Sequence, residues 1–310
     1  GELGVVLCGL GTIMEGIENN PVVYHALYES AWLNAPPDID NWLKDYAKSR
    51  YGAISADAEK AWSILNKTVY HSTTDQQGPS ENLMCARPGL DVKSVSTWGT
   101  SKLYYSSDSL LLAWDAMIQA ARELDNNEAF QYDLVDLTRQ VISNYAYTLY
   151  PELISAYKKG NMREFMDLSK RFLALFDDLN DVLKTKKEFL LGPWIDDAKA
   201  WGNSQQQKDK LEKEVKMLIS TWGERILSEQ GELHDYAFRE WEGIMLDLYK
   251  SRGEKYFNML SKTTARGAEP AIDWFDFEYA WIMNKKQYST EPVGNPSEAC
   301  IKVYEKYRNL

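Results

Sequence analysis

The sequence predicts a mainly α-helical protein, with an all-α domain that begins near residue 37. Beyond Pro36, apolar residues recur every three or four positions, and loops rich in Gly, Pro, Ser and Thr separate these stretches. No stretch after Pro36 alternates apolar and polar residues for long, so we expect no sheet there. Ahead of it, residues 4–10 are small and apolar and are long enough for one buried strand. A chain of 310 residues suffices for one large domain or two.

The predicted helices share this spacing of three and four. They cover residues 21–33, 39–50, 56–70, 107–124, 130–159, 165–183, 189–201, 207–222, 234–260, 272–286 and 297–306. The fifth helix is long enough to be the central element of a bundle. We expect the tryptophans on these apolar stripes to be core residues; they are Trp42, Trp62, Trp114, Trp241 and Trp281. The longest irregular stretch covers residues 72–95.

A glutamate lies where the single predicted strand gives way to the first helix. Gly9, Gly11 and Gly16 allow the backbone to turn sharply around Glu15. The following run of two asparagines and Pro21 is typical of a helix cap and first turn. Aromatic and apolar residues of that helix recur at helical spacing, so we expect one face to be buried and to anchor the loop; they are Tyr24, Leu27, Tyr28, Ala31 and Trp32.

Several segments together resemble one enzyme family. The run Met14-Glu15-Gly16-Ile17-Glu18-Asn19-Asn20-Pro21-Val22-Val23-Tyr24, followed by Ala31-Trp32, is similar to the end of the catalytic barrel in the α-N-acetylglucosaminidases, glycoside hydrolase family 89. Further segments follow in the family's order: Arg50-Tyr51-Gly52, Cys85-Ala86-Arg87-Pro88, the run from Phe130 to Gln140, the run from Phe189 to Trp194, Thr221-Trp222-Gly223 and Asp235-Tyr236-Ala237. Their order carries the resemblance, which covers nearly the whole chain.

The resemblance implies a division of the chain and a reaction. Residues 1–36 would form the C-terminal end of a TIM-like catalytic barrel, and residues 37–310 an all-α C-terminal domain. The implied reaction is the release of terminal α-linked N-acetylglucosamine from glycans with retention of configuration, without a metal or cofactor. Glu15 stands at the position of the family's nucleophile. The family's acid/base glutamate lies upstream of this sequence, so we expect the isolated chain to be inactive.

The resemblance also implies a substrate-binding rim. Trp222 and Tyr236 stand at either end of a polar, Gly-containing link, residues 223–233. By similarity to the family's pocket-lining segments, Trp222, Leu233 and Tyr236 would border the terminal sugar. Flat aromatic side chains suit this role because they stack on the C–H faces of a pyranose ring.

Other interpretations remain open from the residues alone. Glu15 taken without the resemblance is more simply a solvated loop residue. Glu18 lies near a helix start, where the helix dipole stabilises a carboxylate, and Glu29 follows His25 by four residues, as structural surface pairs do. A helical interaction module without catalysis is the alternative function, because the body is helical and the acid/base glutamate is missing. A full barrel encoded upstream would favour the enzyme.

Composition excludes several classes of protein. With 35 basic and 46 acidic residues the net charge is −11, which disfavours a nucleic acid or an anionic membrane as partner. No apolar run reaches membrane-spanning length. The three cysteines and three histidines are too scattered for a disulfide framework or a zinc site, and the glycine-containing run at Gly9 lacks the third glycine of a dinucleotide fingerprint. The family resemblance implies a lysosomal, secreted or periplasmic location, and the sequence does not determine the oligomeric state.

Overall fold

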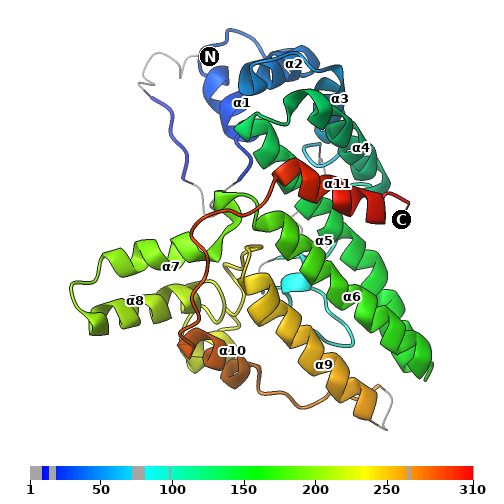
Figure 1. Ribbon diagram of the computed structural model, residues 1–310, viewed down its shortest axis with the longest axis vertical. Coiled ribbons are helices and arrows are strands. Elements are labelled where there is room, and N and C mark those ends of the chain that lie inside the picture. The colour runs from blue at the N-terminus through cyan, green and yellow to red at the C-terminus, as the bar shows by residue number, and fades with distance from the viewer. Residues whose placement is uncertain (1–8, 14–18, 72–80, 98, 264–266, 310) are drawn as a thin grey trace.

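The computed structural model describes residues 9–13, 19–71, 81–97, 99–263 and 267–309, and these residues form a helical protein (Figure 1). Its longer helices are α1 (Val22–Ser30), α2 (Ile39–Tyr51), α3 (Ala56–Lys67), α4 (Ser107–Leu124), α5 (Glu128–Lys158), α6 (Met162–Leu183), α7 (Leu191–Ala200), α8 (Gln205–Leu218), α9 (Ser251–Lys262), α10 (Trp274–Met283) and α11 (Pro296–Tyr307). Within the described residues there is no β-strand, and an isolated bridge joins Leu190 to Glu242. The predicted mainly α class is therefore confirmed. The predicted strand falls on residues 4–10, of which the first five lie outside the described part, while Gly9 and Leu10 have no regular structure.

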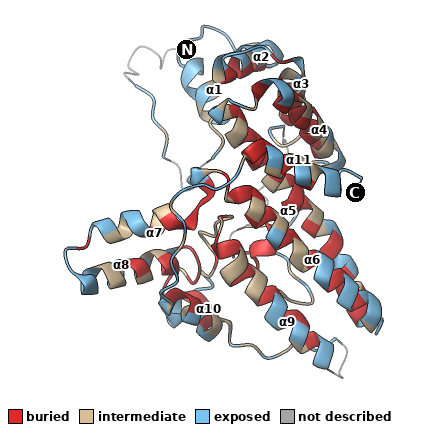
Figure 2. Cartoon of the chain, in the orientation of Figure 1, coloured by how far each residue is buried: buried red, intermediate tan, exposed pale blue. Residues whose placement is uncertain are grey.

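Helix α5 is the central element, as its length predicted. It packs against α4, α6 and α11. It runs through the middle of the molecule, between the group formed by α1 to α4 and helix α9 (Figure 1). Asn127 caps its first turn by accepting a hydrogen bond from the backbone N–H of Phe130. Buried residues follow most of the length of α5, whereas the outer faces of α6 and α9 are exposed (Figure 2).

The tryptophans that were predicted as core residues pack as expected. Trp62, Trp114, Trp241 and Trp281 are buried, and Trp42 is half-buried and stacks on Tyr46. The nitrogen of Trp114 donates a hydrogen bond to the Thr138 hydroxyl, which satisfies its one polar atom inside the core.

The end of the long irregular stretch is part of the core. Its described portion begins at Glu81 and includes a single helical turn, η2 (Leu83–Cys85), in which all three residues are buried. Asn82 caps this turn through the N–H of Met84. The Glu81 carboxylate accepts hydrogen bonds from the backbone N–H groups of Val95 and Ser96 and so closes the loop on itself. The loop end is thus fixed from within.

The predicted helix at residues 234–260 is wrong in its first ten residues. Helical structure begins only near Ile244, as the π-helical turns η5 (Met245–Lys250) that continue into α9. The N–H of Asp235 donates to Ser220 O, and that of Glu242 donates to Phe189 O, so these groups bond to other segments rather than to a helix of their own. Gly243 then has a φ of +92°, which an L-residue rarely adopts. The predicted helix 207–222 likewise ends early, at Leu218.

The predicted buried face of the first helix is also wrong for this chain. Only Val22 of α1 is buried, and Trp32, just beyond the helix, is 87% exposed. The helix instead contacts α2 through a different face, on which the His25 ring packs edge-on against Tyr46. Glu29, on the same face, accepts a hydrogen bond from the Trp42 nitrogen. Periodicity identified an apolar stripe correctly but could not show which stripe meets the helical domain.

Two leucines of α4 allow a matched test of the core. We expect Leu110→Ala to lower the free energy of unfolding by about 2–5 kcal/mol, because the side chain is 1% exposed and its removal leaves a cavity. Leu112→Ala, two residues along the same helix and 61% exposed, should change it by about 0.5 kcal/mol or less. Urea unfolding followed by circular dichroism measures both. Equal losses would show that α4 does not present these faces as described.

Candidate functional site

Trp222 and Tyr236 lie together, although fourteen positions separate them in the sequence. Their ring centroids are 4.8 Å apart and the rings meet edge to face at 71°. The N–H of Trp222 donates to Met217 O and thereby ends α8. Leu233 belongs to the same turn as Tyr236, because its carbonyl accepts the Tyr236 N–H. All three side chains are half-buried, so each presents part of its surface to solvent.

The backbone of this segment is strained at three points. Trp222, Glu232 and Asp235 have φ angles of +63°, +53° and +56°, and among the described residues they are the non-glycine residues with positive φ. Such conformations cost about 1–2 kcal/mol per residue and persist only where the surroundings enforce them. Strain of this kind often accompanies functional sites.

A buried carboxylate holds the strained segment. Asp235 is fully buried, and its N–H donates to Ser220 O at 2.6 Å. Its side chain accepts a hydrogen bond from Arg252 at 2.9 Å, and Nδ1 of His234 lies 3.2 Å from its other oxygen. Burial alone would raise the pKa of Asp235, but attraction to Arg252 and the contact with His234 outweigh it, so the pKa is lowered below its ordinary value.

Arg252 joins this carboxylate to a second one. The guanidinium is fully buried, lies 2.7 Å from Glu278, and donates to the backbone oxygen of Cys85 at 2.7 Å. Glu278 is also fully buried and accepts two hydrogen bonds from Arg87, at 2.9 and 2.7 Å. A continuous buried ion network therefore connects η2, α9, α10 and the turn at Asp235.

The sequence interpretation missed Arg252 and Glu278. A signal was present, because Arg252 lies three residues after Tyr249 and four before Tyr256, both of which are 1% exposed. A charged residue on such a stripe requires a charged or polar partner inside the fold. The sequence near Arg252 does not show which residue that partner is.

Glu15, the predicted nucleophile, lies outside the described residues. Five residues after it, the Asn20 amide donates a hydrogen bond to the Asp133 carboxylate at 3.1 Å. Asp133 also accepts two hydrogen bonds from Arg50, at 2.6 and 2.9 Å, and one from the Tyr51 hydroxyl at 2.8 Å. Three of the segments that carry the resemblance thus meet at one carboxylate.

A second contact of α5 reaches the segment that contains Tyr236. Glu240, four residues after Tyr236, forms an ion pair with Arg139 and accepts a hydrogen bond from the Ser143 hydroxyl at 2.7 Å. Arg139 and Asp133 lie on the same helix, six residues or about 9 Å apart along its axis. Helix α5 therefore contacts both Asn20 and Glu240.

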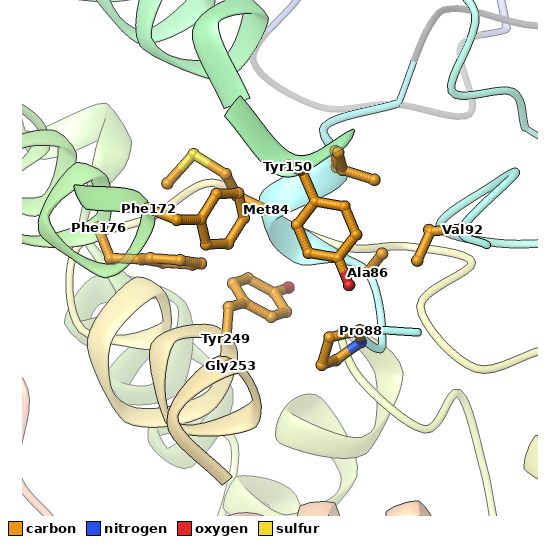
Figure 3. A pocket seen from close by; sticks show the side chains of 10 residues that line it. Met84, Ala86, Pro88, Val92, Tyr150, Phe172, Phe176, Tyr249 and Gly253 are labelled. Carbon is orange, nitrogen blue, oxygen red and sulfur yellow. The ribbon is translucent and has the colours of Figure 1, made fainter. Parts of the chain in front are cut away.

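A cavity under η2 is lined by none of the predicted site residues Trp222, Leu233 and Tyr236. It is enclosed largely by apolar side chains, and its interior of about 10 Å³ holds about one water molecule, which is far too small for a sugar (Figure 3). Its lining residues are Leu83, Met84, Ala86, Pro88, Val92, Tyr150, Phe172, Phe176, Tyr249 and Gly253. We therefore assign it to core packing.

In the described part of the chain no group of three or more histidine, cysteine or acidic side chains is arranged to hold a metal ion. Cys85 and Cys300 are buried free thiols, and burial raises the pKa of each above its ordinary value. Cys8 lies outside the described residues. None of the described helices combines the length and apolar character that crossing a membrane requires.

Comparison with known proteins identifies the family. Residues 42–306 match the model of the α-N-acetylglucosaminidase (NAGLU) C-terminal domain. The chain belongs to this family. It is 29% identical to human α-N-acetylglucosaminidase over 309 residues, which are 97% of this chain and 40% of that protein.

Solved structures of a bacterial glycoside hydrolase share the fold. The family 89 glycoside hydrolase of Clostridium perfringens is 35% identical, with a TM-score of 0.89 over 94% of this chain and 34% of the bacterial one. One of these structures is a complex of a double Glu-to-Gln variant with its substrate, GlcNAc-α-1,4-galactose, and another contains 2-acetamido-1,2-dideoxynojirmycin. The chain spans well under half the length of these relatives.

Proposed function

We propose that this chain is the C-terminal part of a retaining exo-glycosidase that releases terminal α-linked N-acetylglucosamine from glycans. Residues 1–36 would complete the catalytic barrel and residues 37–310 form the helical domain beside it. The match of the family model to residues 42–306 supports this division. The substrate complex of the Clostridium relative supports the choice of sugar.

Two side-chain contacts made by α5 support the proposal for the site. Asp133 holds Asn20, five residues after Glu15, and Arg139 holds Glu240, four residues after Tyr236. One helix thus holds Asn20 and Glu240 through side chains that lie six positions apart. This arrangement supports a common sugar pocket lined by Trp222, Leu233 and Tyr236.

In the proposed mechanism one carboxyl group is the nucleophile and a second is the acid/base. Glu15 attacks the anomeric carbon and forms a glycosyl-enzyme intermediate, while a second glutamate protonates the leaving oxygen and later activates water. In retaining enzymes the two groups lie roughly 5 Å apart. Since the second glutamate belongs to the upstream part of the barrel, this chain supplies the nucleophile and the rim only. The proposed location in a lysosome, a periplasm or the extracellular space rests on the family resemblance.

The isolated chain provides the first test. We expect the 310-residue chain to release no aryl group from an aryl α-N-acetylglucosaminide above the buffer rate, because it lacks the acid/base glutamate. The full-length parent, in which the upstream barrel precedes this chain, should hydrolyse the same substrate. Robust turnover by the isolated chain would refute the two-carboxylate argument. An inactive full-length parent that binds a protein partner would favour the helical interaction module.

A further inference from the structure

Asp133 accepts hydrogen bonds from three residues in two separate segments. Arg50 and Tyr51 come from the end of α2, and Asn20 comes from the turn before α1. The Asp133 side chain is 2% exposed, and the Arg50 guanidinium that pairs with it is 17% exposed. The Tyr51 hydroxyl in turn accepts a hydrogen bond from the buried Trp62 nitrogen, so the carboxylate sits in a fixed frame. A buried carboxylate with this many partners has one orientation.

Asn20 uses both ends of its side chain. Its amide nitrogen donates to Asp133, while its oxygen accepts the N–H of Val22 at 3.2 Å in the first turn of α1. A single side chain thus couples the start of α1 to the middle of the helical domain. Only a neutral side chain with a donor and an acceptor satisfies both contacts, because a second carboxylate at this position would repel Asp133.

We propose that Asp133 is a positioning residue that fixes the turn at Asn20, five residues after the candidate nucleophile, where the loop predicted to carry it ends. This inference rests on the proposed function. The burial of Val22 and the contact between His25 and Tyr46 orient α1 by packing. The Tyr28 hydroxyl also lies 2.6 Å from the Thr12 hydroxyl ahead of the loop, but that contact is exposed. The hydrogen bond from Asn20 to Asp133 is part-buried, and a charged acceptor makes it strong.

A purely structural role predicts something different. If Asp133 only joins α2 to α5 through Arg50 and Tyr51, then Asn20 is dispensable for the reaction rate. If Asp133 positions the loop, a change at Asn20 lowers kcat without unfolding the domain, since a misplacement of about 1 Å costs roughly 100-fold in rate.

The test uses Asn20→Asp in the full-length parent. This variant keeps the oxygen that accepts the Val22 N–H but replaces the donor to Asp133 with a repelling carboxylate. We expect kcat to fall roughly 100-fold while the thermal unfolding midpoint of the helical domain is retained. Asn258→Asp, which adds the same charge on the exposed side of α9, is the matched control and should be unchanged.

The outcomes separate this inference from the proposed function. Parent-like kcat in Asn20→Asp, alongside an inactive Glu15→Gln, overturns the positioning role and leaves the nucleophile assignment standing. If Glu15→Gln is active, the proposed function fails. Hydrogen exchange on the isolated chain then tests whether Asn20 is held by Asp133. Amides in the first turn of α1 should then exchange roughly tenfold faster in Asn20→Asp than in the parent, with α5 unchanged. Equal exchange in that turn would overturn the inference.

Discussion

Replacement of Glu15 by glutamine in the full-length parent should abolish turnover and leave folding intact. Glutamine preserves the volume and shape of the side chain but cannot act as an anionic nucleophile. We expect a loss of about 4 kcal/mol or more of transition-state stabilisation, which corresponds to about 1,000-fold in kcat. Release of an aryl group from an aryl α-N-acetylglucosaminide measures the rate, and a thermal unfolding scan measures stability.

Glu18→Gln is the control for this prediction. Glu18 is the nearest competing carboxylate in the sequence, and its expected role is to interact favourably with the start of α1. Its loss should leave kcat within about threefold of the parent and cost about 0.3–1 kcal/mol of stability. Near-normal turnover by Glu15→Gln, or an inactive Glu18→Gln, would show that the nucleophile has been assigned to the wrong residue.

Arg252→Met should destabilise the chain more than any surface substitution. The change leaves Asp235 and Glu278 buried without the cation between them, and it removes a donor to the Cys85 carbonyl. Breaking a buried ion pair by removing one partner costs about 3–5 kcal/mol, because the remaining charge stays in the interior. Guanidinium unfolding followed by tryptophan fluorescence measures the loss.

Arg225→Met provides the matched comparison. Arg225 also contacts two carboxylates, Asp273 and Asp276, but its side chain is 47% exposed, so water screens and replaces these contacts. Its loss should cost about 1 kcal/mol or less. If both variants lose the same stability, the network around Arg252 does not contribute as a buried one should.

The network also explains the conformation of the turn that holds Tyr236 against Trp222. Asp235 can hold a left-handed backbone conformation because Arg252, His234 and the carbonyl of Ser220 fix it from three sides. The stability lost in Arg252→Met should therefore be accompanied by a change in the environment of Trp222, whose ring lies against Tyr236. The conformation of the turn at Tyr236 and the stability of the core thus both depend on the Arg252 guanidinium.

The sequence predicted most helices because helical periodicity is a local property. An amphipathic helix such as α4 reveals its buried face within its own 18 residues, and the caps at its ends are local as well. The same locality explains the failure at residues 234–243. That segment contains aromatic residues at helical spacing, but its backbone groups bond to Ser220 and Phe189, which lie outside any local window.

The sequence by itself determined the helical class, the central helix, the family resemblance and the candidate residues, because each depends on residue types and their spacing. Only the tertiary structure decided that Trp222 and Tyr236 touch, that Asn20 meets Asp133 across 113 positions, and that Arg252 reaches Cys85 across 167. It also decided which face of α1 packs on the domain. Such contacts depend on how distant segments are placed in space. The partner of a buried charge comes from a distant segment, and the two meet only in the folded chain.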